Sequence, residues 1–298
     1  MPHAKPPALP RLLPSLKGVR VLSLALNLPG PAALMRCRQM GARCVKLEPP
    51  TGDPMHHYSP PAHITLNRGI RVVTADLKTP EGQKVLHREL ARTDVLLTSF
   101  RPSALAKLKL GWRALHRQYP LLSQVAVVGY PAERAEEPGH DLSYMVEHGL
   151  ITGLELPATL YADMAGALMA VEAVLQATLL RSSGGKGVHL DVALSNAAAW
   201  LALPRAWGLM TPGTHVAGGH AGYCVYPCKD GRVAVAALEP HFAARLCEAA
   251  GVGSFSTAKM LTPAMHQTIA NFLLAQTRRQ LDRMAKLRDI PLHTLPKS

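Results

Sequence analysis

Short apolar runs and longer amphipathic segments alternate along residues 18–130. The apolar runs have the length of buried strands, and a segment with helical spacing of apolar residues follows most of them. Pro29-Gly30-Pro31 ends the first run, Gly41 suits the end of a helix, and Thr79-Pro80 suits the start of one. The predicted strands lie at residues 19–26, 43–48, 70–77, 94–100 and 121–130. Strands alternating with helices predict βαβ units and an open, mainly parallel sheet.

The ends of these strands predict where a ligand binds. In open parallel sheets, ligands bind beyond the carboxyl ends of the strands. The loops after Leu26, Phe100 and Tyr130 are therefore expected to face the site. Glu48 closes the second strand, as an acidic residue does in dinucleotide-binding folds. The first turn reads LNLPGPAAL, however, and lacks the G-x-G-x-x-G pattern that cradles a pyrophosphate, which argues against NAD binding.

The second half of the chain has a different pattern. Residues 162–181 predict one long helix, and SSGGKG followed by VHLDVAL is a hairpin signal. A glycine-rich stretch then precedes a hairpin with Asp230-Gly231 as its turn, and helices are expected at 241–250 and 263–287. The pattern predicts a large Rossmann-like α/β domain and a smaller α+β domain. Their expected bounds are 1–195 for the large domain, 196–214 for a linker and 215–287 for the small domain.

Composition indicates the compartment. The chain has 298 residues, of which 48% are apolar, so it can bury a sizeable core. Its five cysteines are odd in number and widely spread, which argues against a secreted disulfide scaffold. The first residues are too rich in proline for a signal peptide, and the apolar stretch 196–210 is too short to span a bilayer. We therefore expect a cytoplasmic protein without a membrane partner.

Charge indicates a polyanionic partner. The formal net charge is +13, which favours nucleic acid, an anionic membrane or a phosphate-rich small molecule. The sequence has no recognition helix, aromatic platform or RNA-binding motif, so we expect no nucleic acid. His220, Cys224 and Cys228 lie at spacings that do not converge on one metal ion, and we expect no metal site. The glycine-rich segment 182–187 ends a helix instead of opening one, unlike a P-loop.

Three positions carry candidate acid or base groups. His140 lies in PGHDLSY just after a predicted strand, Asp163 lies in the first turn of the long helix, and Glu239 closes a hairpin strand. Free N–H groups at a helix start stabilise a carboxylate. Each residue also has a purely structural interpretation. His140 can be a hydrogen-bonded loop histidine, Asp163 a helix cap and Glu239 a solvated strand end.

Taken together, these segments resemble the family III CoA transferases, a superfamily that includes formyl-CoA transferase, carnitine CoA transferase and α-methylacyl-CoA racemase. The matching strings follow the family order over residues 16–242. They are LKGVRVLSLA, PGPAALMRCRQMGARCVKLEPPTGDP, LNRGIRVVTADLKTPEGQ, TDVLLTSFRPSALAKLKLG, PGHDLSY, YADMAGALMAVEAVLQATLLRSSGGKG and YPCKDGRVAVAALEPHF. His140, Asp163 and Glu239 fall on the motifs that carry the acid and base residues of the racemase branch.

The resemblance implies an acyl-CoA enzyme that needs no prosthetic group. In a racemase, His140 and Asp163 would flank the α-carbon of a 2-methylacyl thioester, and Glu239 would orient the imidazole. The N–H groups that begin the Asp163 helix would stabilise the enolate oxygen. In a CoA transferase, Asp163 would instead attack the thioester and form an anhydride. A relative that binds CoA without turnover is the third alternative.

The resemblance also implies how coenzyme A and a second subunit are bound. Arg71 and Arg101 fall on motifs that face the CoA phosphates, and Asp141 and Tyr144 are expected to contact CoA as well. The family forms interlocked homodimers, in which Glu239 and His140 would come from different subunits. Residues 288–298 are expected to be a shortened segment returning to the large domain. Two departures concern the residues after Asp163, where Ala165 and Ala167 replace expected glycines and are predicted to narrow the pocket.

Overall fold

The computed structural model describes residues 12–253 and 255–297, which form two compact units. The division between the units lies at Ala202 and Leu203, inside helix α9 (Leu194–Ala206). Each unit has its own hydrophobic core. The helix across the division replaces the first part of the predicted linker, because the apolar stretch there has helical spacing and buries Ala197, Ala198 and Ala202.

The first unit contains a six-stranded parallel sheet, as the alternation of strands and helices predicted. The strand order is β3-β2-β1-β4-β5-β6, which reverses direction between β1 and β4. The strands are β1 (Arg20–Ser23), β2 (Arg43–Glu48), β3 (Arg71–Thr74), β4 (Val95–Thr98), β5 (Ser123–Val128) and β6 (His189–Ala193). This order and the parallel pairing make the unit Rossmann-like.

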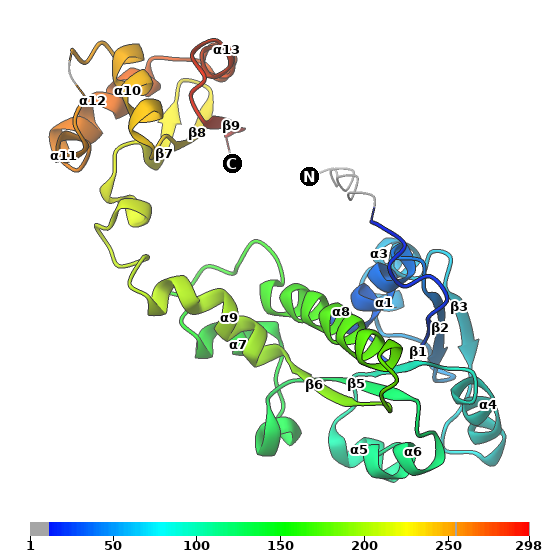
Figure 1. Cartoon of the computed structure of the whole chain (residues 1–298). Helices are drawn as coiled ribbons and strands as arrows, with labels where there is room; N and C mark the ends of the chain where they lie inside the picture. The colour runs from blue at the N-terminus through cyan, green and yellow to red at the C-terminus, as the bar shows by residue number, and fades with distance from the viewer. Residues whose placement is uncertain (1–11, 254, 298) are drawn as a thin grey trace. The chain divides into compact units, whose positions relative to one another are not determined.

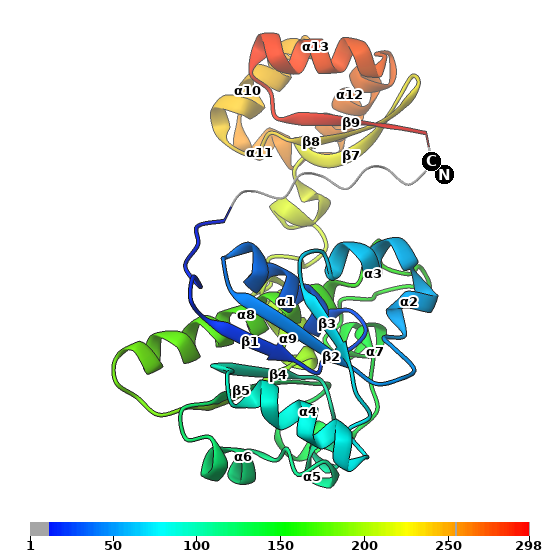
Figure 2. The same cartoon turned by 90° about the vertical axis from the view of Figure 1, so that its right-hand side faces the viewer.

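Helices cover both faces of this sheet (Figures 1 and 2). One apolar core lies between the sheet and α1, α7 and α8, and a second lies between the sheet and α4, α5 and α6. Neighbouring residues Val21 and Leu22 of β1 belong to opposite cores, as expected for the side-chain alternation of a strand. The helices are α1 (Pro29–Gln39), α2 (Met55–Tyr58), α3 (Pro60–Leu66), α4 (Pro80–Leu90), α5 (Pro102–Lys107), α6 (Trp112–Gln118), α7 (Asp141–Glu147) and α8 (Tyr161–Ser182).

The second unit combines a three-stranded antiparallel sheet with helices. The sheet has the order β7-β8-β9, with β7 (Tyr223–Cys228) and β8 (Gly231–Ala236) joined by the predicted Asp230-Gly231 turn. The helices are α10 (Pro240–Ala249), α11 (Thr257–Met260), α12 (Pro263–Leu274) and α13 (Arg278–Arg288). The fold class predicted from the sequence, a parallel α/β domain with a small α+β domain, is therefore confirmed.

Three local predictions differ from the structure. The strand after the glycine-rich turn, β6, pairs in parallel with β5 and forms no hairpin, because the long crossover through α8 brings it to the sheet edge. Residues 263–287 form two helices because Thr277 caps α13, its hydroxyl accepting from the Gln280 N–H group. The expected return segment is β9 (Leu292–Pro296), which pairs with β8 in the small sheet because its backbone groups find partners there.

Helix α8 meets the length and hydropathy of a membrane span, and among the described helices it alone does so. Its buried alanine and valine side chains belong to the core of the first unit. One face of α8 therefore packs in the core of the first unit.

Candidate active site

A cavity of about 480 Å³ opens at the carboxyl ends of the parallel strands. Leu26 and Asn27 line it after β1, Ser99 and Phe100 line it after β4, and Gly129 follows β5. The strand order reverses between β1 and β4, so the cavity lies at the switch point where open α/β sheets bind ligands. The predicted position of the site, at the loops that follow three strands, agrees with this cavity.

Two of the three predicted acid/base residues line this cavity. His140 precedes α7, where its backbone N–H group donates to the Ser143 hydroxyl at 3.0 Å. Asp163 lies in the first turn of α8 and is partly buried. The two residues are 23 positions apart in the sequence, but α7 and the start of α8 place them on the same cavity.

Asp141 connects these two helices. Its carboxylate Oδ1 accepts a hydrogen bond from the backbone N–H group of Asp163 at 2.9 Å. Its Oδ2 is buried and has no hydrogen-bond partner among the described residues. Asp141 was predicted to contact CoA, and in the structure its carboxylate also anchors the first turn of α8.

The environment of Asp163 raises its carboxyl pKa to about 6. Burial is the largest cause, the negative charge of Asp141 adds to it, and His140 opposes it. A carboxyl group with a pKa near neutral pH can accept a proton and also return one. The electrostatics therefore suit acid/base chemistry at Asp163.

The backbone at the start of α8 is occupied by internal hydrogen bonds. The Asp163 N–H group donates to Asp141, and the Met164 N–H group donates to the Leu160 carbonyl oxygen at 3.1 Å. These two groups are not free to stabilise an enolate, which corrects part of the expectation from the sequence. Ala167 lies in the core, and neither it nor Ala165 lines the cavity, so their methyl groups do not narrow it.

Tyr144 forms a buried wall of the cavity. Its ring packs edge-to-face on Tyr130 with 5.1 Å between centroids, and burial raises the pKa of its hydroxyl to about 12. A Cβ atom on Gly139 would lie 2.5 Å from the Tyr144 ring, and one on Gly129 would lie 2.7 Å from its hydroxyl. Glycine at both positions therefore makes room for this aromatic side chain.

The remaining predicted site residues do not all meet at the cavity. Arg101 precedes α5, is exposed and lines the cavity. Arg71 is at the amino end of β3, where it pairs with Glu89 at 2.6 Å, and it does not line the cavity. Glu239 is exposed and precedes α10 in the second unit. The structure therefore groups His140, Asp163 and Arg101 in the first unit and leaves Arg71 away from them.

A second cavity of about 760 Å³ shares Phe100 with the first. It lies between the start of α4 and α5, and its lining includes Lys78, Lys107 and Lys109. No sequence motif indicated these lysines as site residues. Lys78 lies just before α4, whereas Lys107 and Lys109 lie at the end of α5, so only the fold brings the two segments together.

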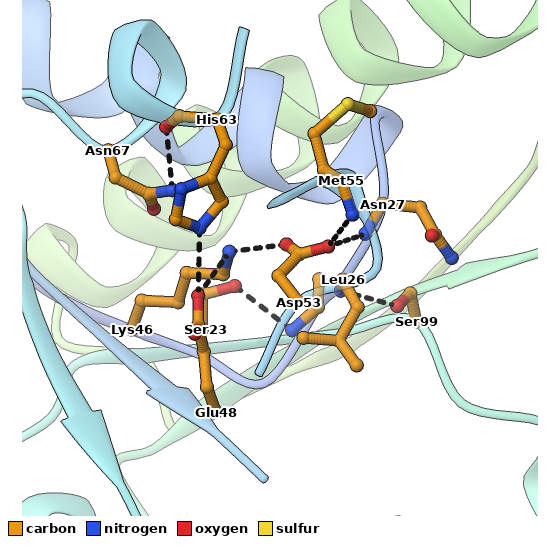
Figure 3. A network of polar contacts seen from close by, with 11 residues as sticks. Ser23, Leu26, Asn27, Lys46, Glu48, Asp53, Met55, His63, Asn67 and Ser99 are labelled. Atoms are coloured by element: carbon orange, nitrogen blue, oxygen red, sulfur yellow. Dashed lines mark hydrogen bonds and ion pairs between the residues drawn. The ribbon is translucent and has the colours of Figure 1, made fainter. Parts of the chain in front are cut away.

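Sequence reasoning also missed a buried polar network beside the first cavity (Figure 3). Lys46 on β2 is fully buried and contacts the carboxylates of Glu48, at 2.9 Å, and Asp53, at 2.5 Å. His63 of α3 lies 3.6 Å from Glu48. The sequence signal was a lysine inside an apolar strand, where an unpaired charge would be costly.

The fold and the cavity define an α/β protein with a carboxyl group and an imidazole at the switch point of a parallel sheet. A family model described as CoA-transferase family III matches residues 16–296. The chain belongs to this family, whose members act on CoA thioesters as racemases or CoA transferases.

Relatives with both activities resemble this chain. Alpha-methylacyl-CoA racemase from Homo sapiens is 29% identical over 292 residues, covering 89% of this chain and 73% of the relative. Succinate–glutarate CoA-transferase from Agrobacterium fabrum is 30% identical over 286 residues, covering 86% and 69%. A crystal structure of a hypothetical protein from Mycobacterium tuberculosis superposes with a TM-score of 0.80 and 26% identity, covering 93% of this chain and 83% of that chain.

Proposed function

We propose that the protein transfers the α-proton of a 2-methylacyl-CoA thioester, as a racemase does. The observation that carries this proposal is the placement of His140 and Asp163 on one cavity, with the pKa of Asp163 raised to about 6. Removing a weakly acidic α-proton requires a base, and returning a proton to the opposite face requires an acid. An imidazole and a carboxyl group on the same cavity supply both.

The reaction proceeds in two proton transfers. The first group removes the α-proton, the C–H electron pair forms a carbon–carbon double bond, and the carbonyl π electrons move to the thioester oxygen. The second group then donates a proton to the opposite face of the enolate, and the carbonyl re-forms. His140 acts at one face and Asp163 at the other, so their assignments exchange between the two directions. Glu239 is proposed to orient His140.

The two cavities, which share Phe100 as a lining residue, suit the two ends of coenzyme A. The thioester lies in the cavity with Asp163, and the nucleotide end extends past Phe100 into the second cavity. Lys78, Lys107 and Lys109 provide cations there for the phosphates, together with Arg101 at the first cavity. This anionic ligand accounts for part of the +13 formal net charge.

CoA transfer is the second candidate function, because a CoA-transferase is among the relatives that cover most of this chain. The carboxylate of Asp163 would attack the thioester carbonyl, form a mixed anhydride and release CoA as a thiolate. The thiolate would then attack the Asp163 carbonyl of the anhydride, release the donor carboxylate and form an aspartyl-CoA thioester. The acceptor carboxylate would attack this thioester and release the thiolate, which would finally attack the acceptor acyl carbon of the second anhydride and free the Asp163 carboxylate. This mechanism needs Asp163 but does not need His140.

Deuterium exchange separates these candidates. In D₂O, the wild-type protein is expected to incorporate deuterium at the α-carbon of 2-methylacyl-CoA. His140→Ala and Asp163→Asn should each reduce the rate of racemisation by about 10²- to 10⁴-fold.

If the reaction is CoA transfer, Asp163→Ala should abolish activity and His140→Ala should be tolerated. Hydroxylamine should then trap an adduct on Asp163. Full activity of His140→Ala, with no deuterium exchange in the wild type, would refute the racemase proposal. Tight CoA binding with neither exchange nor transfer would indicate a relative without turnover.

A further inference from the structure

Lys46, the buried cation of the network in Figure 3, pairs with a carboxylate that holds two loop segments in place. The Lys46 side chain has no solvent exposure, and Asp53 is almost as buried. Burying an ammonium group and a carboxylate is unfavourable unless both are paired and hydrogen-bonded. Here the Lys46 ammonium contacts Oδ2 of Asp53, which leaves Oδ1 free for other partners.

Oδ1 of Asp53 accepts two backbone hydrogen bonds from different segments. The Asn27 N–H group donates at 3.0 Å and the Met55 N–H group donates at 2.9 Å. Asn27 belongs to the loop between β1 and α1, and Met55 begins α2. Asp53 therefore ties together two segments that both line the cavity with His140 and Asp163.

Asn27 has an unusual backbone conformation where it contacts Asp53. Its φ is +67°, in the left-handed region that few residues other than glycine adopt. The Asn27 side chain extends away from the ion pair (Figure 3), and Asn27 lines the cavity. A carboxamide can both donate and accept hydrogen bonds. It therefore matches the amide groups in the flexible arm that joins the nucleotide of CoA to its sulfur.

We propose that Asn27 binds an amide of the CoA arm, and that Asp53 and Lys46 are positioning residues that hold Asn27 in its left-handed conformation. This assignment rests on the proposed function as an acyl-CoA enzyme. It adds a contact for the arm, which lies between the thioester and the nucleotide cavity.

Two variants test the contact and its support separately. Asn27→Gly removes the carboxamide but keeps the left-handed backbone accessible, so the protein should fold normally. Asp53→Asn keeps an oxygen acceptor but removes the charge that pairs with Lys46. Isothermal titration calorimetry should show about tenfold weaker binding of acetyl-CoA to each variant. Asn27→Gly loses the hydrogen bond to the ligand, and Asp53→Asn loses the orientation of the Asn27 side chain. Binding of 3′,5′-ADP, which lacks the arm, should be unchanged.

Asp94→Asn is the matched control for a general loss of stability. Asp94 also accepts from a backbone N–H group, that of Arg20 at 2.8 Å, and also pairs with a cation, Arg181. It lies before β4, at the amino end of the sheet, and does not line the cavity. Asp94→Asn should lower the Tm but leave the Kd of acetyl-CoA unchanged.

The outcomes separate this assignment from the proposed function. If wild-type protein binds acetyl-CoA and Asn27→Gly binds it equally well, the contact is wrong. If Asp53→Asn weakens acetyl-CoA and 3′,5′-ADP binding equally, the positioning assignment is wrong and Asp53 has a general structural effect. If the wild type binds neither ligand, the proposed function itself fails.

Discussion

At the residue scale, the chemistry of the site depends on two neighbouring carboxyl groups. Asp163 has a raised pKa because it is partly buried and close to the negative charge of Asp141. Asp141 in turn holds the Asp163 backbone through its Oδ1 atom. Asp141 thus holds the Asp163 backbone and adds to the increase in the Asp163 pKa, which burial mainly causes.

The pH dependence of proton exchange tests this coupling. Below a pH of about 6, Asp163 is mostly protonated and cannot act as the base, so the exchange rate that depends on it should rise with pH through that value. Asp141→Asn keeps the oxygen that accepts from Asp163 N–H but removes the negative charge. The pKa of Asp163 should therefore fall, and the rise in rate should move to lower pH. A profile that does not move, in a variant that still folds, would contradict the assigned cause.

At the element scale, the first turn of α1 packs closely on the loop that follows β1, and both border the cavity. A Cβ atom on Gly30 would lie 2.2 Å from the Cβ atom of Ala25, a distance that the packed backbone cannot relieve without moving the helix. This loop carries Asn27 and connects β1 to α1. Glycine at this position therefore sets the spacing of a helix that borders the site.

We expect Gly30→Ala to destabilise the protein by about 1–3 kcal/mol, since it adds a methyl group to a filled core. Urea unfolding measures this change. Gly153→Ala is the matched control, because its added methyl group meets no atom within 4 Å and its free energy of unfolding should change by less than about 0.5 kcal/mol. Equal free energies of unfolding for the two variants would show that α1 can shift to accommodate the added methyl group.

At the scale of the whole molecule, the proposed acid/base set includes a residue from each unit. His140 and Asp163 belong to the first unit and Glu239 to the second. We propose a homodimer in which a second subunit supplies Glu239. We expect sedimentation at micromolar concentration to give a dimer, and activity to fall when dilution produces monomers. An active monomer would exclude this arrangement. Glu239→Gln should reduce racemisation less than His140→Ala, because Glu239 acts through the imidazole.

The sequence by itself determined the layers of the fold and the position of the site along the chain. Strand-length apolar runs such as 94–100 and the helical spacing of 162–181 are local properties, so they predicted β4 and α8. The rule that ligands bind beyond strand ends then indicated the loops after Leu26 and Phe100, which do line the cavity.

Only the tertiary structure decided which side chains meet. Arg71 and Arg101 both lie beside strands in the sequence, but the first is at the amino end of β3 and the second follows the carboxyl end of β4. Lys46 was predicted only as part of an apolar strand. Its pairing with Asp53, seven residues later, depends on how the chain turns between them. The physical reason is that strand and helix formation follows local periodicity, whereas charge pairing depends on distances that only the packed chain establishes.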